Sequence, residues 1–325
     1  MTFITRRHAL ALGGSSLLLP SFAHAQAAWP TGPVTFVVGY AAGGSTDINA
    51  RELAQVMTPV IGQTIVIDNK GGAAGSIGLR AAANAKPDGQ TLFVAVGTNV
   101  IINPWVQKGM IDTLAALAPA AQITDYQYVL VVGNSVPAKN AAELVALAKK
   151  DPEKLTYSSS GVGGNNHLAG ALFAEAAGIK MTHVPYKGTG PAVADVISGQ
   201  ITANFSSLPP AVSQIKGGNL KALAVTGNKR VKSLPDVPTL KEQGIDVVVT
   251  SWQGVFAPTK TPDAILDKIE KAIKDGMKDP KWEAALARDG LEMPPERTRA
   301  EFAKFVAEEH AFWGKTLKKL NIEME

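Results

Sequence analysis

Two glycine-rich segments of the same design constrain the fold of this chain more than any other feature. The first, residues 39–47 (GYAAGGSTD), follows the β-branched run Val34–Val38; the second, residues 69–76 (NKGGAAGS), follows residues 64–67 (TIVI). Both then run into helix-like sequence. Glycine lets the backbone turn several N–H groups toward one point, and a helix N-terminus adds about half a positive charge there. The pattern predicts two strand–loop–helix units whose loops bind an anion without a catalytic side chain.

The alternation of short β-branched runs with alanine-rich helical stretches continues along the chain, which predicts an α/β fold with mostly parallel strands. We expect strands at residues 34–38, 65–67, 91–96, 128–132, 155–157, 182–184, 201–205 and 222–225, and a strand-like stretch at 246–249. We expect helices at residues 47–61, 76–85, 140–149, 165–177, 191–198, 209–216, 263–277, 280–288 and 298–320.

The length of 325 residues favours two domains over one. The C-terminal helices cannot bury their apolar faces alone, so we expect them to fold back on the first domain. Domain 1 then comprises residues 26–123 and 250–325, and domain 2 comprises residues 124–249. The chain crosses between the domains near residues 100–125 and 226–252, and two crossings make a hinge with a ligand cleft beside it.

The first 25 residues have the pattern of an export signal. Basic residues open it, residues 9–19 are mostly apolar, and Ala23-His24-Ala25 is a small-x-small cleavage site, which predicts cutting before Gln26 and a periplasmic protein. The adjacent Arg6 and Arg7 favour the twin-arginine route over the general one. The alternative, a membrane anchor, is disfavoured because the apolar stretch is short and is interrupted at residues 13–16 (GGSS).

Charge and cysteine usage exclude several function classes. The net charge of +4 includes the two signal arginines, so 30 basic residues face 28 acidic ones in the mature chain. No basic patch is interleaved with aromatic residues, so we expect no nucleic-acid partner. The absence of cysteine excludes disulfides and thiolate metal sites.

A third loop of similar character lies in the middle of the chain, at residues 157–167 (YSSSGVGGNNH). Its hydroxyls, and the N–H groups where the following helix begins, suit an oxygen-rich anion; a flexible surface turn is the alternative. The sequence holds no H-E-x-x-H zinc motif, no G-x-S-x-G nucleophile elbow and no phosphate-binding G-x-x-x-x-G-K-[ST]. We therefore expect no catalytic residue, no metal and no cofactor, and we interpret His167 and His183 as hydrogen-bonding histidines.

Taken together, these motifs resemble the TctC/Bug family, the periplasmic receptors of tripartite tricarboxylate transporters. The resemblance covers essentially the whole mature chain. It rests, in chain order, on Trp29–Pro30, Ala41–Asp47, Arg51, Asn69–Gly75, Pro87–Gly89, Thr91–Leu92, Tyr157–Gly161, His167, Val184–Gly188, Gly199–Ile201 and Leu234–Thr239.

The resemblance implies a type II-like, two-domain periplasmic binding protein fold with a hinge, closing on a small carboxylate. It also implies permease subunits as membrane partners, and we expect a monomer. The ligand-binding candidates that it implies in the first domain are Tyr40, Ala41, Ala42, Gly43, Gly44, Ser45, Thr46, Gly72, Ala73, Ala74 and Gly75. Those in the second domain are Ser159, Ser160, Gly163, Asn165, His167, Lys187 and Asp195.

Two departures from the family pattern leave the ligand open. Many members carry phenylalanine at the position of Tyr40 and a second glycine at the position of Ala74. The Tyr40 phenol suits either stacking on a ring or a hydrogen bond to a carboxylate, so aromatic and aliphatic acids both remain candidates. A ligand-sensing subunit for a signalling receptor is the alternative function, and an exported hydrolase or isomerase is a third.

Overall fold

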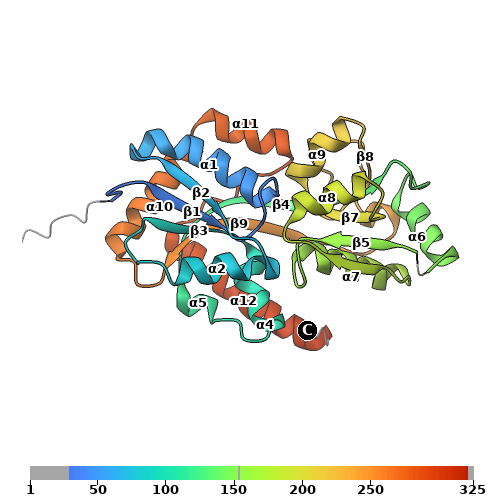
Figure 1. Cartoon of the computed structure of the whole chain (residues 1–325), viewed down its shortest axis with the longest axis horizontal. Helices are drawn as coiled ribbons and strands as arrows, with labels where there is room; N and C mark the ends of the chain where they lie inside the picture. The colour runs from blue at the N-terminus through green and yellow to red at the C-terminus, as the bar shows by residue number, and fades with distance from the viewer. Residues whose placement is uncertain (1–28, 153, 321–325) are drawn as a thin grey trace, which may run out of the picture.

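The computed structural model describes residues 29–152 and 154–320, so the export-signal prediction lies outside the described residues. These residues form an elongated molecule with two lobes (Figure 1). The strands are β1 (Val34–Val38), β2 (Ile65–Asn69), β3 (Thr91–Val96), β4 (Leu117–Gly133), β5 (Thr156–Ser159), β6 (Thr182–Pro185), β7 (Ala203–Ser207), β8 (Leu220–Val225) and β9 (Thr250–Pro258).

Helices surround these strands. They are α1 (Ser45–Ile61), α2 (Ser76–Ala83), α3 (Gly97–Ile101), α4 (Asn103–Val106), α5 (Thr113–Ala116), α6 (Ala141–Lys150), α7 (Asn165–Ala177), α8 (Thr189–Ile197), α9 (Leu208–Lys216), α10 (Asp263–Met277), α11 (Pro280–Asp289) and α12 (Arg299–Leu320). Two short 3-10 helices are η1 (Ala73–Gly75) and η2 (Lys241–Gln243). We call the elements around β1, β2 and β3 the first lobe, and those around β5, β6 and β7 the second lobe.

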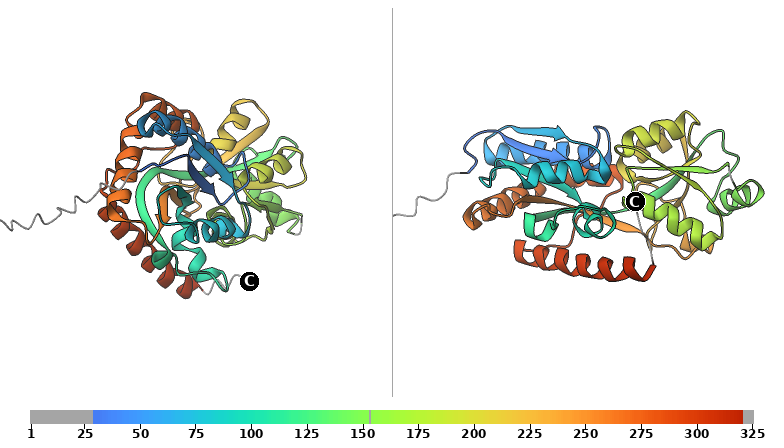
Figure 2. Two further views of the ribbon diagram at one scale, coloured as in Figure 1. Left: turned by 60° about the vertical axis from the view of Figure 1, so that its left-hand side comes forward. Right: turned by 60° about the horizontal axis from the view of Figure 1, so that its bottom comes forward.

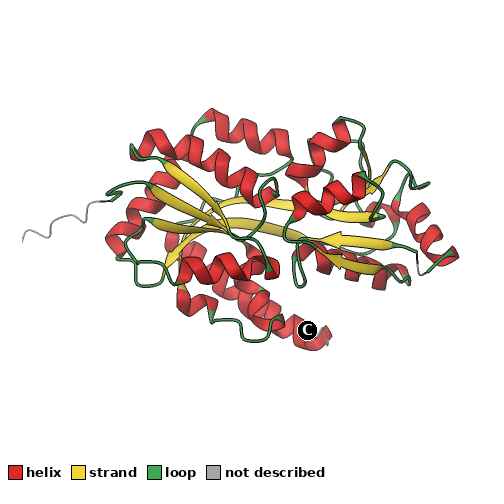
Figure 3. Ribbon diagram, in the orientation of Figure 1, coloured by secondary structure: helices red, strands yellow, loops and turns green. Residues whose placement is uncertain are grey.

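One sheet runs through both lobes, in the order β2-β1-β3-β9-β4-β7-β5-β6, with β8 also paired to β4 (Figure 3). The strands of each named group of three are parallel, as predicted. The central strands β4 and β9 run antiparallel to their neighbours, so the prediction of a mostly parallel sheet is wrong for the middle of the molecule.

Strand β4 joins the two lobes. Its residues 117–127 pair with β9, and its residues 128–133 pair with β7 and β8. We predicted only residues 128–132 as a strand. The earlier part escaped prediction because its pairing with β9 shifts register between Pro119 and Ala121 and again between Gln122 and Thr124, which breaks the alternation of buried and exposed residues.

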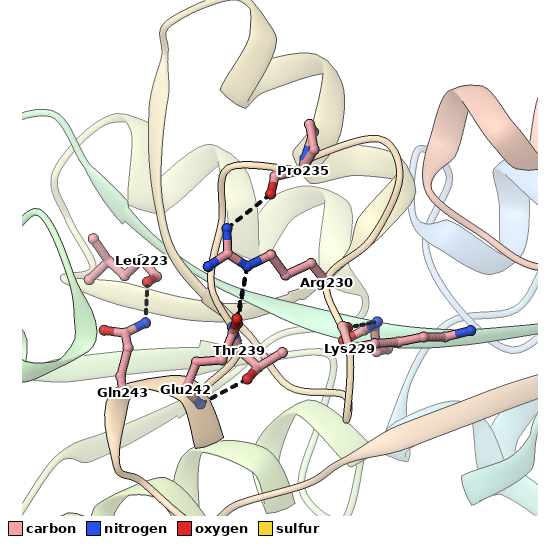
Figure 4. A network of polar contacts seen from close by, with 8 residues as sticks. Leu223, Lys229, Arg230, Pro235, Thr239, Glu242 and Gln243 are labelled. Carbon is pink, nitrogen blue, oxygen red and sulfur yellow. Dashed lines mark hydrogen bonds and ion pairs between the residues drawn. The ribbon is translucent and has the colours of Figure 1, made fainter.

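The segment that returns from the second lobe to the first, between β8 and β9, is mostly irregular, and the strand predicted at residues 246–249 does not form. Residues 238–240 instead pair with the end of β8. The Val225 N–H donates to the Pro238 carbonyl, and the Leu240 N–H donates to the Val225 carbonyl. An exposed ion pair between Arg230 and Glu242 fastens this return segment (Figure 4). Strand β9 begins only at Thr250.

Helices cover both faces of the sheet. Leu53 and Met57 of α1 pack with Ile269 and Ile273 of α10 in one core, which continues into the second lobe. On the opposite face, α12 runs along one side of the first lobe, where Phe302 packs against Trp252 of β9 (Figure 2). The C-terminal helices thus pack on the first lobe.

Candidate functional site

The loop between β1 and α1 places a helix N-terminus at the centre of the molecule. Gly43 has a left-handed φ of 79°, and α1 begins at Ser45. The Gly43 N–H donates to Oδ2 of Asp47 at 2.9 Å, and Arg51 binds the same carboxylate at 2.9 Å. Burial alone would raise the pKa of Asp47, but the hydrogen bonds from Arg51 and Gly43 lower it. The protein's own carboxylate therefore holds one amide of this loop, whereas Gly44, Ser45 and Thr46, where α1 begins, line the cavity described below.

The loop between β2 and α2 is a tight turn with an unusual backbone. Ala73 and Ala74 have φ values of 47° and 48°, a region that L-residues other than glycine rarely occupy. The Tyr40 hydroxyl donates to the Ala74 carbonyl at 3.1 Å and accepts from Nδ2 of Asn99 at 2.8 Å. Burial raises the pKa of Tyr40, so this hydroxyl keeps its proton. The hydroxyl uses its proton in the hydrogen bond to the Ala74 carbonyl, and Tyr40 also forms part of the wall of the cavity described next.

A small cavity of about 20 Å³ lies between the lobes, enough for roughly one water molecule. Its lining residues are Tyr40, Gly44, Ser45, Thr46, Val96, Thr98, Tyr126, Tyr128, Ser160, Asn165, Asn166, Thr189 and Ser207. No charged side chain occurs among these described residues, whereas hydroxyl groups are abundant. The cavity thus offers neutral hydrogen-bond donors and aromatic surface.

Four helices of nine or more residues begin at this cavity. Residues 44–46 start α1, residues 165–166 start α7, Thr189 starts α8, and Ser207 is the N-cap of α9. The first N–H groups of a helix have no partner within it, and the peptide dipoles sum to a partial positive charge there. The N-termini of α1, α7 and α8 therefore make the cavity favourable for an anion although no cationic side chain lines it. The N-terminus of α9 adds its dipole but fewer donors, because Pro209 and Pro210 have no N–H group.

The third predicted loop divides between the cavity and a separate cluster. Ser160 and Asn165 line the cavity. Ser159 instead contacts Nε2 of His183 at 2.6 Å, and the rings of His167 and His183 stack with centroids 3.9 Å apart. The Gly163 N–H donates to Nδ1 of His167 at 3.1 Å. Burial, and then the neighbouring His167, lowers the pKa of His183 to about 4, so both rings are neutral at pH 7 and shape the loop beside the cavity.

Nine further predicted residues lie outside the cavity lining: Ala41, Ala42, Gly43, Gly72, Ala73, Ala74, Gly75, Lys187 and Asp195. The Lys187 side chain is exposed, and its carbonyl accepts from the Ala41 N–H at 3.1 Å across the two lobes. The Asp195 carboxylate accepts from the Tyr186 hydroxyl. These contacts assign Lys187 a backbone role between the lobes and give Asp195 a partner within its own lobe.

Sequence reasoning missed six polar lining residues: Thr98, Tyr126, Tyr128, Asn166, Thr189 and Ser207. Thr98 follows the end of β3 and Ser207 ends β7, so the strand-end position that identified the glycine loops would also have identified them. Tyr126 and Tyr128 lie two residues apart on β4 and so share one face of it.

A larger cavity of about 740 Å³ lies beside β4, β9 and α12, and shares Tyr126 and Asn165 with the small one. Its lining includes three acidic residues, Asp125, Glu292 and Glu309, and two basic ones, Lys229 and Arg297. Burial raises the pKa of Asp125 to about 6 despite the nearby Arg297. An excess of acidic groups disfavours an anion here, so the small cavity is the better anion site.

Within the described ranges, no group of three His, Cys, Asp or Glu side chains is arranged to hold a metal ion. No helix in that part of the chain is both long and apolar enough to cross a bilayer.

Known proteins are similar to this chain in fold and in sequence. The model of the tripartite tricarboxylate transporter family receptor matches residues 49–322. The solved structure of the periplasmic binding protein BugD has a TM-score of 0.87 at 33% identity, and the match covers 91% of this chain and 100% of BugD. An R. palustris protein solved with adipate has a TM-score of 0.87 at 31% identity, covering 92% of this chain and 100% of that one.

A third structure, MatC from Rhodopseudomonas palustris with bound malate, has a TM-score of 0.84 at 28% identity, covering 88% of this chain and 99% of that one. The family that the matched model describes consists of transport receptors rather than enzymes. The chain described here belongs to the TctC/Bug family of periplasmic solute-binding proteins, the receptors of tripartite tricarboxylate transporters.

Proposed function

We propose that this protein captures a small organic carboxylate, an aliphatic di- or tricarboxylate or an aromatic acid, and delivers it to the permease subunits of a tripartite tricarboxylate transporter. The observation that carries the proposal is the convergence of four helix N-termini on a cavity lined by hydroxyl and amide groups. Adipate and malate, the ligands of the two relatives named above, are both dicarboxylates.

The first carboxylate of the ligand is expected at the start of α1. The Ser45 and Thr46 side chains and their N–H groups lie at the cavity, and Asp47 already occupies the Gly43 N–H on the far side of the loop. Ser160 and Asn165 approach from the second lobe. The rings of Tyr126 and Tyr128 supply apolar surface for the carbon body of the ligand.

Binding of a dicarboxylate requires the lobes to move apart, because the cavity has room for about one water molecule. We propose residues 26–123 and 250–325 as one domain, residues 124–249 as the other, and β4 with the chain entering β9 as the hinge. The Ala41–Lys187 hydrogen bond would break on opening and reform on closing. Ligand contacts made only in the closed state would shift the population toward it.

We further propose that the chain is exported, is cleaved before Gln26 and acts as a monomer. Intact-mass measurement on protein from a periplasmic extract tests the cleavage site: a mature chain beginning at Gln26 is expected. Sedimentation velocity tests the monomer, and a dimer at micromolar concentration would contradict it.

Isothermal titration calorimetry with matched acids and amides tests the ligand class. The mature protein would be titrated with adipate, malate, citrate and benzoate, and then with the uncharged amide of each acid that binds. We expect at least one acid to bind saturably and its amide to bind at least a hundredfold more weakly, because the helix N-termini favour negative charge. Equal binding of acid and amide would contradict the proposal.

A further inference from the structure

The turn between β2 and α2 holds the two residues in the described chain, other than glycines, that have positive φ: Ala73 at 47° and Ala74 at 48°. A residue with a Cβ is strained in this conformation, so contacts with its surroundings are needed to offset the strain. Ala74 is fully buried, so its polar backbone groups also need partners within the protein. Something outside the turn must therefore hold it.

Three donors converge on the carbonyl oxygen of Ala74. Asn99 Nδ2 donates at 2.7 Å, Asn103 Nδ2 donates at 3.0 Å, and the Tyr40 hydroxyl donates at 3.1 Å. Asn99 and Asn103 are fully buried. A carbonyl oxygen has two lone pairs, so three donors exceed what satisfying a buried group needs. Their effect is to fix the direction of this one peptide group.

The donors are themselves fixed by the first lobe. Oδ1 of Asn99 accepts from the Val96 N–H at 3.0 Å, which ties Asn99 to the end of β3. Nδ2 of Asn103 also reaches the Ser76 hydroxyl at 3.2 Å, and that hydroxyl donates to Oε1 of Gln107 at 2.6 Å. Gln107 returns to the turn by donating to the Ala73 carbonyl at 3.2 Å. The turn is thus anchored to β3, α3 and α4.

The turn faces the second lobe on its other side. A Cβ built on Gly161 would lie 2.8 Å from the Ala74 nitrogen, so the two backbones meet with no room for a side chain between them. Any rotation of the Ala74 peptide would therefore disturb Tyr40, whose hydroxyl donates to the Ala74 carbonyl and whose ring lines the cavity. It would also alter the surface on which the second lobe closes.

We propose that Asn99 and Asn103, together with the Tyr40 hydroxyl, are positioning residues that hold the Ala73–Gly75 turn in its left-handed conformation through the Ala74 carbonyl, and so set the affinity of the closed site. This inference rests on the proposed carboxylate function. None of the three needs to touch the ligand to act in this way.

The chain offers a closely matched control for Asn103. Asn204 is equally buried, its Nδ2 donates to the carbonyl and hydroxyl of Ser158 at 2.8 and 2.9 Å, and its Oδ1 lacks a partner, as does that of Asn103. Asn103→Ala and Asn204→Ala should therefore lower the melting temperature similarly. Calorimetry with whichever of adipate, malate, citrate or benzoate the wild type binds should show at least tenfold weaker binding for Asn103→Ala and less than threefold for Asn204→Ala. Equal losses of affinity would overturn the inference.

A glycine background separates positioning from general stability. Glycine adopts a φ near +48° readily, so in an Ala74→Gly chain the turn depends less on its anchors. Adding Asn103→Ala to that background should weaken binding less than threefold. The same tenfold loss in both backgrounds would overturn the inference. Tyr40→Phe, which keeps the ring at the cavity, should weaken binding about threefold; an unchanged affinity would contradict a role for the hydroxyl.

Amide hydrogen exchange tests the anchoring without any ligand. Residues 72–76 should exchange at least tenfold faster in Asn103→Ala than in Asn204→Ala, and equal rates would overturn the inference on their own. Failure of the proposed function has a different signature: the wild type would bind none of the four acids although the exchange difference is present.

Discussion

The two glycine-rich loops of the first lobe look alike in sequence and are supported in different ways. The loop after β1 passes into the seventeen-residue helix α1, and its Gly43 amide is held by the carboxylate of Asp47 within the same segment. The loop after β2 is a turn of two left-handed alanines, held by the side chains of Asn99 and Asn103 more than twenty residues away. Two loops with similar sequences are thus stabilised differently: the first by a side chain of its own segment, and the second by side chains distant in the sequence.

The difference has consequences for which substitutions each loop tolerates. At Gly43 of the first loop an added Cβ would meet open space. At Gly75 of the second loop it would meet the Asn99 amide and the Tyr40 ring, and Gly161 of the other lobe lies against Ala74. We therefore expect the second loop to be the more sensitive to added atoms and the first to be the more sensitive to charge.

The largest effect is expected from placing a methyl group on equivalent left-handed glycines. Gly75 has a φ of 91°, and a Cβ there would lie 2.4 Å from Nδ2 of Asn99, whereas Gly43 has a φ of 79° and nothing within 4 Å. Gly75→Ala should lower the free energy of unfolding by about 2–4 kcal/mol, because backbone strain and overpacking add. Gly43→Ala should lower it by about 1 kcal/mol, from strain alone. Urea denaturation measures both, and equal values would remove the contrast between the loops.

A smaller effect is expected from neutralising the support of the first loop. Asp47→Asn removes a buried carboxylate that Arg51 and the Gly43 N–H both bind, and should lower the free energy of unfolding by about 1 kcal/mol at pH 7. Because the pKa of Asp47 is lowered in the folded protein, this stabilisation is present above its unfolded value of 3.8 and is lost as the pH falls through the folded value. If the difference in free energy of unfolding between Asp47→Asn and the wild type were the same at pH 3 as at pH 7, the charge of Asp47 would not be responsible for it.

The third loop should also lose stability as the pH falls, but at higher pH than the first loop. His183 has a pKa of about 4 in the folded protein against 6.5 unfolded, so the unfolded chain takes up a proton that the folded chain does not as the pH falls between these values. The wild type should therefore lose more stability than His183→Gln between pH 6.5 and pH 4, with the two changing in parallel above pH 7. Urea denaturation at several pH values measures this. Parallel loss of stability throughout would contradict a neutral His183.

The smallest effect is expected at the exposed charges that begin the second loop. Lys70 pairs with Asp68 at 2.8 Å, but both side chains are about two-fifths exposed, so solvent screens the pair. Lys70→Met should change the free energy of unfolding by less than about 0.5 kcal/mol. A loss comparable to that of Asp47→Asn would mean that charge supports the second loop as well.

Much of the fold was predictable from periodicity. The predicted bounds of β1, β3, α7 and α10 coincide with those in the structure, because their apolar spacing is regular and their ends carry clear signals. The full length of β4 and the short helices α3, α4 and α5 were missed. Bulges interrupt the two-residue periodicity of a strand, and a helix of four or five residues is too short to show a helical periodicity. Residues 246–249 have a strand-like sequence, but residues 238–240 already pair with Val225 at the end of β8.

The candidate site was predictable only where it follows the strand-end rule. Ser45, Thr46, Ser160 and Asn165 were found in this way and line the cavity. Tyr40 was also found, but the partner of its hydroxyl is a backbone carbonyl 34 residues later, which no local pattern reveals. Asn99 and Asn103 were missed for the same reason: their position matters only once β3 and β2 lie in one sheet.

A crystal structure of the mature protein with its tightest-binding carboxylate tests the central claim most directly. The account predicts one carboxylate group within hydrogen-bond distance of the N–H groups of Ser45 or Thr46 at the start of α1, with Ser160 or Asn165 contacting the ligand from the second lobe. A ligand found instead in the larger cavity beside β4, β9 and α12, bound to Arg297 or Lys229, would contradict it.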